Sequence, residues 1–130
     1  MKKIMLALAA LVMMFAAANA DEAKTVEPQK VKMKIKAKVK GDVVKAKVGI
    51  THEMLTYDQA KKKGKEPNFI THITGTVNDK VVYDASTSQF LSKNPLLKFE
   101  FKSSAAKKGD ILRITYTDLK GVYYDEKKIK

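Results

Sequence analysis

The sequence predicts an all-β protein, an immunoglobulin-like antiparallel β-sandwich of about seven strands. Three observations support this fold class. Apolar and polar residues alternate with a period of two in several short segments, as they do along a strand with one buried face. Turn-forming residues separate these segments at regular intervals, and no segment has an amphipathic helical pattern longer than two turns. A closed β-barrel is the main structural alternative.

The N-terminal residues 1–20 are typical of a cleavable secretory signal. Lys2 and Lys3 precede an uncharged apolar stretch, and Ala18-Asn19-Ala20 has the small-x-small pattern found before cleavage sites. The apolar stretch, residues 4–18, is shorter than the roughly 20 residues that a membrane-spanning helix needs. We therefore favour cleavage by a Sec-type route over a stable membrane anchor, and we expect the protein to lie in the periplasm.

A flexible leader and a single domain are expected after the signal. Residues 21–29 contain Pro28 and lack periodicity. From Val31 to Lys40, apolar residues alternate with lysines, which predicts a half-buried strand. Its lysine face has two interpretations: a docking surface for an acidic partner, or protection of an exposed strand against aggregation, which we favour. Gly41-Asp42 then predicts a hairpin turn. The predicted domain covers residues 30–130.

The remaining elements follow in order. The connection 55–67 is long for a β-protein, so it is either functional or mobile, and Asp58–Lys63 could form a helical turn within it. Later strands are expected where apolar residues alternate between turn signals, and they run from Phe69 to Val77, Val81 to Tyr83, Leu97 to Phe101, Leu112 to Tyr116 and Val122 to Tyr124.

Composition limits the possible functions. The chain contains no cysteine, so it has no thiol nucleophile, thiolate metal ligand or disulfide. Its formal net charge is +12, but Arg113 is the only arginine. Arginine dominates base and bidentate phosphate recognition, whereas lysine is suited to solvated surfaces. We therefore expect no nucleic-acid partner, and either an acidic protein partner or solubility explains the charge.

Catalytic motifs are not found in the sequence. The serines lie in no nucleophile motif, no glycine-rich phosphate loop is present, and the acidic residues form no convincing pair. We expect no enzyme activity and no cofactor. His52 and Met54 suggest an alternative, because imidazole and thioether ligands suit monovalent copper in an exported protein. However, His52 shares its strand face with Val48 and Ile50, which favours a packed or hydrogen-bonding histidine.

Residues 31–130 resemble the SoxZ family, the small subunit of the SoxYZ sulfur-carrier complex of thiosulfate oxidation. Several short motifs occur in register along the domain, and Ser92-Lys93-Asn94-Pro95 is the most specific of them. The others are the lysine-alternating first strand, His52-x-Met54, Pro67-x-Phe69-Ile70, Asn78-x-Lys80, Phe99-x-Phe101, Gly109-Asp110 and Asp118-x-x-Gly121. The sequence departs from the family at Glu53, where proline is usual, at Asp79, where glycine is usual, and in having its own signal.

The resemblance implies an immunoglobulin-like fold and a noncatalytic role. It also implies a heterodimer with SoxY, which holds sulfur intermediates on a cysteine, and transient contact with other Sox enzymes. Candidate interface residues are those of two segments: His52, Met54, Ser92, Lys93, Asn94 and Pro95. The second segment has an alternative interpretation as a simple turn, in which Pro95 forces Asn94 into an extended conformation.

Overall fold

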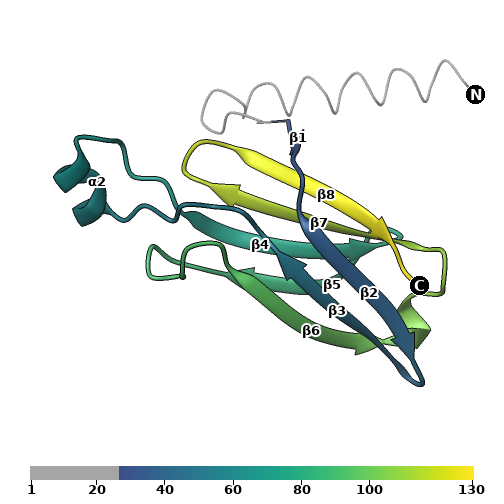
Figure 1. Ribbon diagram of the computed structural model, residues 1–130. Helices are drawn as coiled ribbons and strands as arrows, with labels where there is room; N and C mark the ends of the chain where they lie inside the picture. Colours follow the sequence, from purple (N-terminus) through teal and green to yellow (C-terminus); the bar gives the residue numbers. More distant parts are fainter. Residues whose placement is uncertain (1–26) are drawn as a thin grey trace, which may run out of the picture.

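The computed structural model describes residues 27–130. The predicted signal peptide and most of the predicted leader therefore lie outside the described residues. The described chain forms two packed β-sheets with one short helix at one end (Figure 1). This arrangement confirms the predicted immunoglobulin-like sandwich, because the strands form two separate sheets and not one closed barrel. No helix among the described residues is long and apolar enough to cross a membrane.

The strands divide unequally between the sheets. The larger sheet has the order β1-β8-β7-β4-β5, with β1 at Gln29–Lys30, β8 at Val122–Lys128, β7 at Ile111–Asp118, β4 at Ile70–Val77 and β5 at Lys80–Ser86. The smaller sheet has the order β2-β3-β6, with β2 at Lys34–Lys40, β3 at Val43–Gly49 and β6 at Leu96–Lys102. The 3₁₀ helix η1, Ser103–Ala105, follows β6, and the helix α2, Tyr57–Lys63, lies between β3 and β4.

The first predicted strand, residues 31–40, is a strand only from Lys34 onward, and a short strand that was not predicted, β1, precedes it. Gln29, the last residue of the expected leader, pairs with Tyr123 in the parallel β1–β8 ladder, which is an exception to the predicted antiparallel pattern. The chain then crosses to the smaller sheet, where β2 begins at Lys34. At the crossing, the Met33 side chain is buried and its backbone N–H donates to Asp125 Oδ2 at 2.9 Å. The alternation of apolar residues and lysines from Val31 onward is thus continuous in the sequence, but Val31 bonds to β8 whereas the residues from Lys34 onward pair with β3.

The turns occur where the sequence predicts them. Gly41 has a φ of 60° in the β2–β3 turn, and Asn78 and Asp79 have φ values of 50° and 63° in the β4–β5 turn. Positive φ at both central positions is typical of a two-residue hairpin turn, where Asp is less favourable than Gly. β8 extends to Lys128, beyond the predicted end at Tyr124. Its last residues are polar, so no apolar alternation marks this part of the strand.

The core lies between the sheets. Among the described residues, the largest fully buried side chains include Val44 and Val48 of β3, Ile70 and Ile73 of β4, and Leu112 and Ile114 of β7. The rings of Tyr83 and Phe99 stack with centroids 4.3 Å apart and so join the two sheets. Gly75 lies beneath this pair, where an added Cβ would be 3.3 Å from Tyr83 Cβ and 3.4 Å from Ile114 Cδ1. A larger residue there would disturb the contact between the sheets.

The long connection between β3 and β4 is ordered by local hydrogen bonds. Thr56 and Gln59 form a reciprocal capping box at the start of α2, and Gly64 ends the helix in the left-handed conformation. The predicted helical turn is thus confirmed and begins one residue earlier, at Tyr57. Leu55 and Asn68 exchange backbone hydrogen bonds of 2.7 and 3.0 Å, which close the base of the connection.

The outer face of the smaller sheet places lysines directly opposite one another. Lys47 of the central strand β3 pairs with Lys36 on one side and Lys98 on the other. Lys45, two residues earlier, pairs with Lys38 and with Glu100, whose Oε1 lies 3.6 Å from Lys45 Nζ. Like charges at directly opposed positions destabilise a sheet. The surroundings of Lys47 are therefore less favourable than those of Lys45.

Lys47→Gln is expected to stabilise the protein by a few tenths to about 1 kcal/mol, because it removes repulsion from two neighbours. Lys45→Gln is the matched control on the same strand, since it loses one repulsive and one attractive neighbour and should be near neutral. Urea unfolding of both variants at low and high salt would measure the difference. Equal effects, or a difference that does not shrink with added salt, would contradict a charge-repulsion origin.

Candidate functional site

Three connections meet at one end of the sandwich, which we call the loop end. They are residues 50–69, which include α2, residues 87–95 between β5 and β6, and residues 119–121 between β7 and β8. Figure 1 shows α2 and the other two connections at the left end of the molecule, opposite the C-terminus. The two segments that contain all six predicted interface residues, His52–Met54 and Ser92–Pro95, both lie here.

His52 is a buried, hydrogen-bonded side chain at the centre of the loop end. It is 8% exposed. Its Nδ1 accepts a 3.0 Å hydrogen bond from the backbone N–H of Met54, so the ring proton belongs on Nε2. Nε2 lies 3.0 Å from Asp118 Oδ2 and therefore donates to it. The predicted hydrogen-bonding role of His52 is thus confirmed, but its predicted place on the strand is wrong, because β3 ends at Gly49 and His52 lies in the connection that follows.

The same contacts bear on the copper alternative. Both ring nitrogens of His52 are engaged, and the Sδ atom of Met54 accepts from the backbone N–H of Ile70 at 3.4 Å. Met54 also adopts a φ of 48°, an uncommon conformation for a side chain of this size. Within residues 27–130, no group of three or more His, Cys, Asp or Glu side chains could hold a metal ion. The two proposed ligands therefore fit a structural role.

Asp118 organises the loop end by accepting four hydrogen bonds. Oδ2 accepts from His52 and from Asn68 Nδ2 at 3.1 Å, and Oδ1 accepts from the backbone N–H groups of Lys120 and Gly121 at 2.8 and 2.9 Å. Asn68 Oδ1 in turn accepts from Leu119 N at 3.1 Å. Asp118 therefore joins the connection 50–69 to the connection 119–121. The sequence indicated only a turn at Asp118-x-x-Gly121 and not this buried role.

Tyr116 lies beside His52 and Asp118, and the pKa of its hydroxyl is raised. Its ring meets that of His52 edge-on, with centroids 5.8 Å apart. Burial raises the pKa of Tyr116 from 10.0 to about 12, and the nearby negative charge of Asp118 and the hydroxyl of Tyr123 add to the effect. The folded state therefore holds this proton more tightly than the unfolded state. The resulting stabilisation is complete below about pH 10 and is lost as the pH rises towards 12.

Native-state titration of phenolate absorbance is expected to resolve one tyrosine that ionises near pH 12. In Tyr116→Phe this late component should be absent, because the variant lacks the buried hydroxyl. The variant should also lose less stability than the wild type between about pH 10 and 12. A late component that persists in Tyr116→Phe would assign the raised pKa to another of the five tyrosines.

Asn94 connects the second predicted segment directly to the first. Its backbone N–H donates to His52 O at 2.9 Å, and its Oδ1 accepts from His52 N at 3.0 Å. Asn94 has a φ of 50°, so the predicted extended conformation is wrong. Asparagine tolerates the left-handed region, and here the two hydrogen bonds to His52 hold it there. The following Pro95 is buried, and its carbonyl accepts from Ile50 N at 3.0 Å.

The connection 87–95 is also fixed at its other positions, although it has no regular structure. Thr87 Oγ1 donates to Ile70 O at 2.7 Å, and Gln89 Oε1 accepts from Tyr57 N at 3.3 Å. Phe90 lies within this connection and is 83% exposed. The loop thus holds a large apolar side chain in solvent, at a position that the sequence analysis did not select. The sequence feature that could have identified Phe90 is that it is an aromatic residue within a mostly polar loop.

A groove of about 420 Å³ lies between α2 and this connection. Its lining includes Met54, Gln59, Lys63, Phe90, Ser92 and Lys93. Three of the six predicted interface residues therefore face the groove. The other three, His52, Asn94 and Pro95, hold its two walls together through the hydrogen bonds above. The structure brings the two predicted segments together as one site.

Fold and site together define a small immunoglobulin-like β-sandwich whose buried polar side chains order the loops at one end. A family model described as sulphur oxidation protein SoxZ matches residues 31–128, and no curated protein sequence matches the chain. The chain therefore belongs to the SoxZ family and has a role in a Sox sulfur-oxidation system. This finding confirms the resemblance that the sequence motifs indicated.

Several solved structures share the fold at low sequence identity. The sulfur carrier protein SoxY from Chlorobium limicola f. thiosulfatophilum is 13% identical, with 88% of each chain covered and a TM-score of 0.57. A hypothetical protein from Pyrococcus horikoshii OT3 is 19% identical, with 82% of this chain and 92% of that chain covered and a TM-score of 0.54. A superoxide reductase in the oxidized state is 16% identical, with coverages of 82% and 93% and a TM-score of 0.51. These likenesses concern the fold alone.

Proposed function

We propose that this chain is the noncatalytic subunit that binds and stabilises a cysteine-bearing SoxY-like sulfur carrier in periplasmic thiosulfate or sulfur oxidation. The match of residues 31–128 to the SoxZ family carries the proposal. The absence of cysteine supports it. A chain without a thiol cannot hold sulfur as a persulfide or thiosulfonate, so the covalent cargo must be on a partner.

The loop end is the surface that we assign to the carrier. Aromatic residues that become buried at the centre of an interface commonly supply much of its binding energy. Phe90, which lines the groove and is 83% exposed, is such a residue, and Tyr57 of α2, 56% exposed, is a second aromatic residue at this end. Because the connection that carries Phe90 is fixed by hydrogen bonds, binding need not order it first. Ser92 and Lys93 would add polar contacts at the rim of the groove.

The signal-like N-terminus adds an expectation about assembly. A chain exported unfolded by the Sec-type route would meet its carrier only after export, so the carrier would travel separately. Recovery of the assembled complex in quantity from the cytoplasm would contradict this part of the proposal.

Copurification from cells that produce both proteins tests the main proposal. A tagged form of this chain should retain the carrier in equal amount, and the complex should unfold at a higher temperature than the free carrier. The neighbouring open reading frame supplies the carrier if its product ends in a cysteine-containing, glycine-rich tail. A carrier that is not retained and has an unchanged unfolding temperature would overturn the proposal.

A further inference from the structure

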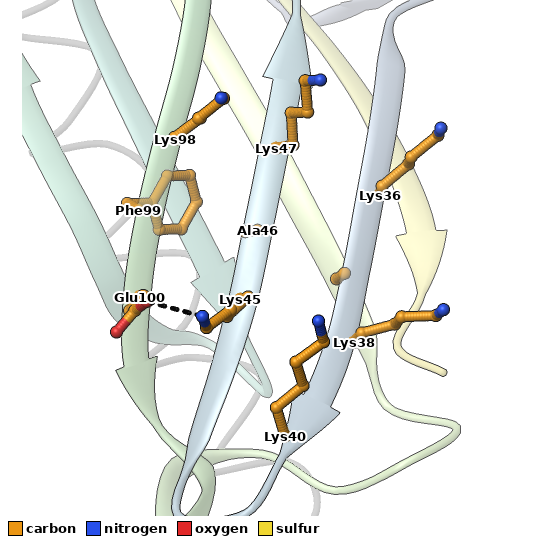
Figure 2. A pocket seen from close by; sticks show the side chains of 10 residues that line it. Lys36, Lys38, Lys40, Lys45, Ala46, Lys47, Lys98, Phe99 and Glu100 are labelled. Carbon is orange, nitrogen blue, oxygen red and sulfur yellow. Dashed lines mark ion pairs between the residues drawn. The ribbon is translucent and has the colours of Figure 1, made fainter.

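The outer face of the smaller sheet is a second surface, separate from the loop end, which we call the lysine face. Its members are Glu100 and the eight exposed lysines on the outer side of β2, β3 and β6: Lys34, Lys36, Lys38, Lys40, Lys45, Lys47, Lys98 and Lys102. Figure 2 shows six of these lysines on one side of the sheet, with Lys45 directed towards Glu100.

Protection of a strand edge, the interpretation favoured from the sequence, applies to β2 and β6 but does not explain the lysines of the central strand. That interpretation applies to an unpaired edge strand, but Lys45 and Lys47 lie on β3, which is paired with β2 on one side and β6 on the other. The edge of β2 is itself partly covered. Lys130 N donates to Ala37 O at 2.9 Å, and Lys130 O accepts from Val39 N at 2.8 Å. Lys45 and Lys47, which lie between two paired neighbours, therefore need another reason.

The charges are arranged at a cost to stability. Lys36, Lys47 and Lys98 form a row across the sheet at directly paired positions, which we call the lysine row. Among the described residues, Lys45–Glu100 is the one ion pair that this face makes. A solvated surface that serves only solubility mixes charges of both signs. A row of like charges is suited to a partner that brings the opposite charge.

The face is also hollowed along β3. A groove of about 400 Å³ lies between the lysines, with Ala46 and Phe99 as part of its lining (Figure 2). The period-two alternation directs the Ala46 side chain to the core, so the strand backbone forms the floor between the lysine side chains. A groove of this kind admits a protruding chain segment, whereas a flat bilayer surface would touch only the lysine tips.

We infer that the lysine face binds a carboxylate-rich segment of a partner protein. Lysine ammonium groups attract carboxylates without the fixed two-pronged geometry of arginine, so the contact is steered by charge and is sensitive to salt. A second depression of about 580 Å³ lies on the other side of β2 and is lined by Lys32, Lys127, Lys128 and Lys130, among others. It extends the positive surface around the β2 edge and allows a longer acidic segment to follow it.

Binding of a labelled peptide of alternating glutamate and serine to the purified chain tests the inference. Substitution of the lysine row, Lys36→Gln, Lys47→Gln and Lys98→Gln together, is expected to weaken binding about tenfold at low salt. The control removes the same number of charges from another cluster, with Lys61→Gln, Lys62→Gln and Lys65→Gln in and just after α2, and should bind the peptide within about twofold of the wild type. Circular dichroism would establish that both variants are folded.

Two results would overturn the inference. Equal loss of peptide binding in both triple variants would assign the attraction to net charge alone. Loss of binding to phosphatidylglycerol vesicles in the row variant, with peptide binding unchanged, would assign the face to a lipid surface.

Carrier binding is measured with the same variants. If the row variant loses both peptide and carrier, the carrier is itself the acidic partner, which supports this inference and contradicts the loop end as the carrier site.

Discussion

Asp118→Ala is expected to lower the free energy of unfolding by about 3–5 kcal/mol. The side chain is 7% exposed and accepts four hydrogen bonds, from His52, Asn68, Lys120 and Gly121. Its removal leaves the buried donor of His52 and three part-buried donors without their acceptor, and each buried loss costs about 1–3 kcal/mol before relaxation. A domain of this size has a total stability of about 5–15 kcal/mol. The variant should therefore be only marginally folded.

Asp84→Ala is the matched control for this prediction. Asp84 also lies on a strand and contacts a histidine, His72, as well as Thr74, but it is exposed to solvent. Exposed pairs of this kind contribute at most about 1 kcal/mol. Denaturant unfolding of both variants gives the comparison. If Asp118→Ala loses no more stability than Asp84→Ala, the hydrogen bonds at Asp118 do not hold the loop end together.

Phe90→Ala is expected to weaken binding of the SoxY-like carrier by about 30-fold or more, equivalent to about 2 kcal/mol. The unfolding free energy should change little, because Phe90 is 83% exposed in the free chain. A large apolar side chain held in solvent by a fixed loop loses little conformational freedom when a partner covers it. Isothermal titration calorimetry with the purified carrier would measure the affinity.

Val81→Ala controls for the loss of exposed apolar surface in general. Val81 is 61% exposed on β5, near the β4–β5 turn and at the opposite end of the sandwich from Phe90. The variant should bind the carrier with unchanged affinity. Equal weakening by the two substitutions, or none by Phe90→Ala, would remove the loop end as the place where the carrier docks.

The fold could be predicted because its strands keep one face buried. In β2, β3 and β6 the alternation of apolar residues with lysines is almost unbroken, and the bounds of β2 and β6 agree within a few residues with those predicted. Strands were predicted less well where their backbone pairing is not accompanied by an alternation of apolar and polar residues. β1 is too short to have a period, and the polar end of β8 is a strand only because β7 provides the backbone partners.

The candidate site was predicted in part, for a related reason. The family motifs identified His52 and Asn94, and the structure joins them by two hydrogen bonds. Asp118 was missed because its partners lie 50 and 66 residues away in sequence, in contacts that only the folded chain creates. The left-handed conformation of Asn94 was missed because Pro95 favours an extended residue before it, and the hydrogen bonds to His52 override that preference.

Native mass spectrometry of this chain mixed with the SoxY-like carrier, after the carrier has been loaded with thiosulfate, tests the central proposal most directly. The account predicts a complex with one copy of each protein. After dissociation, the added sulfur mass should lie on the carrier, and the mass of this cysteine-free chain should be unchanged. Two separate monomers at concentrations well above the micromolar range, or sulfur covalently attached to this chain, would contradict it.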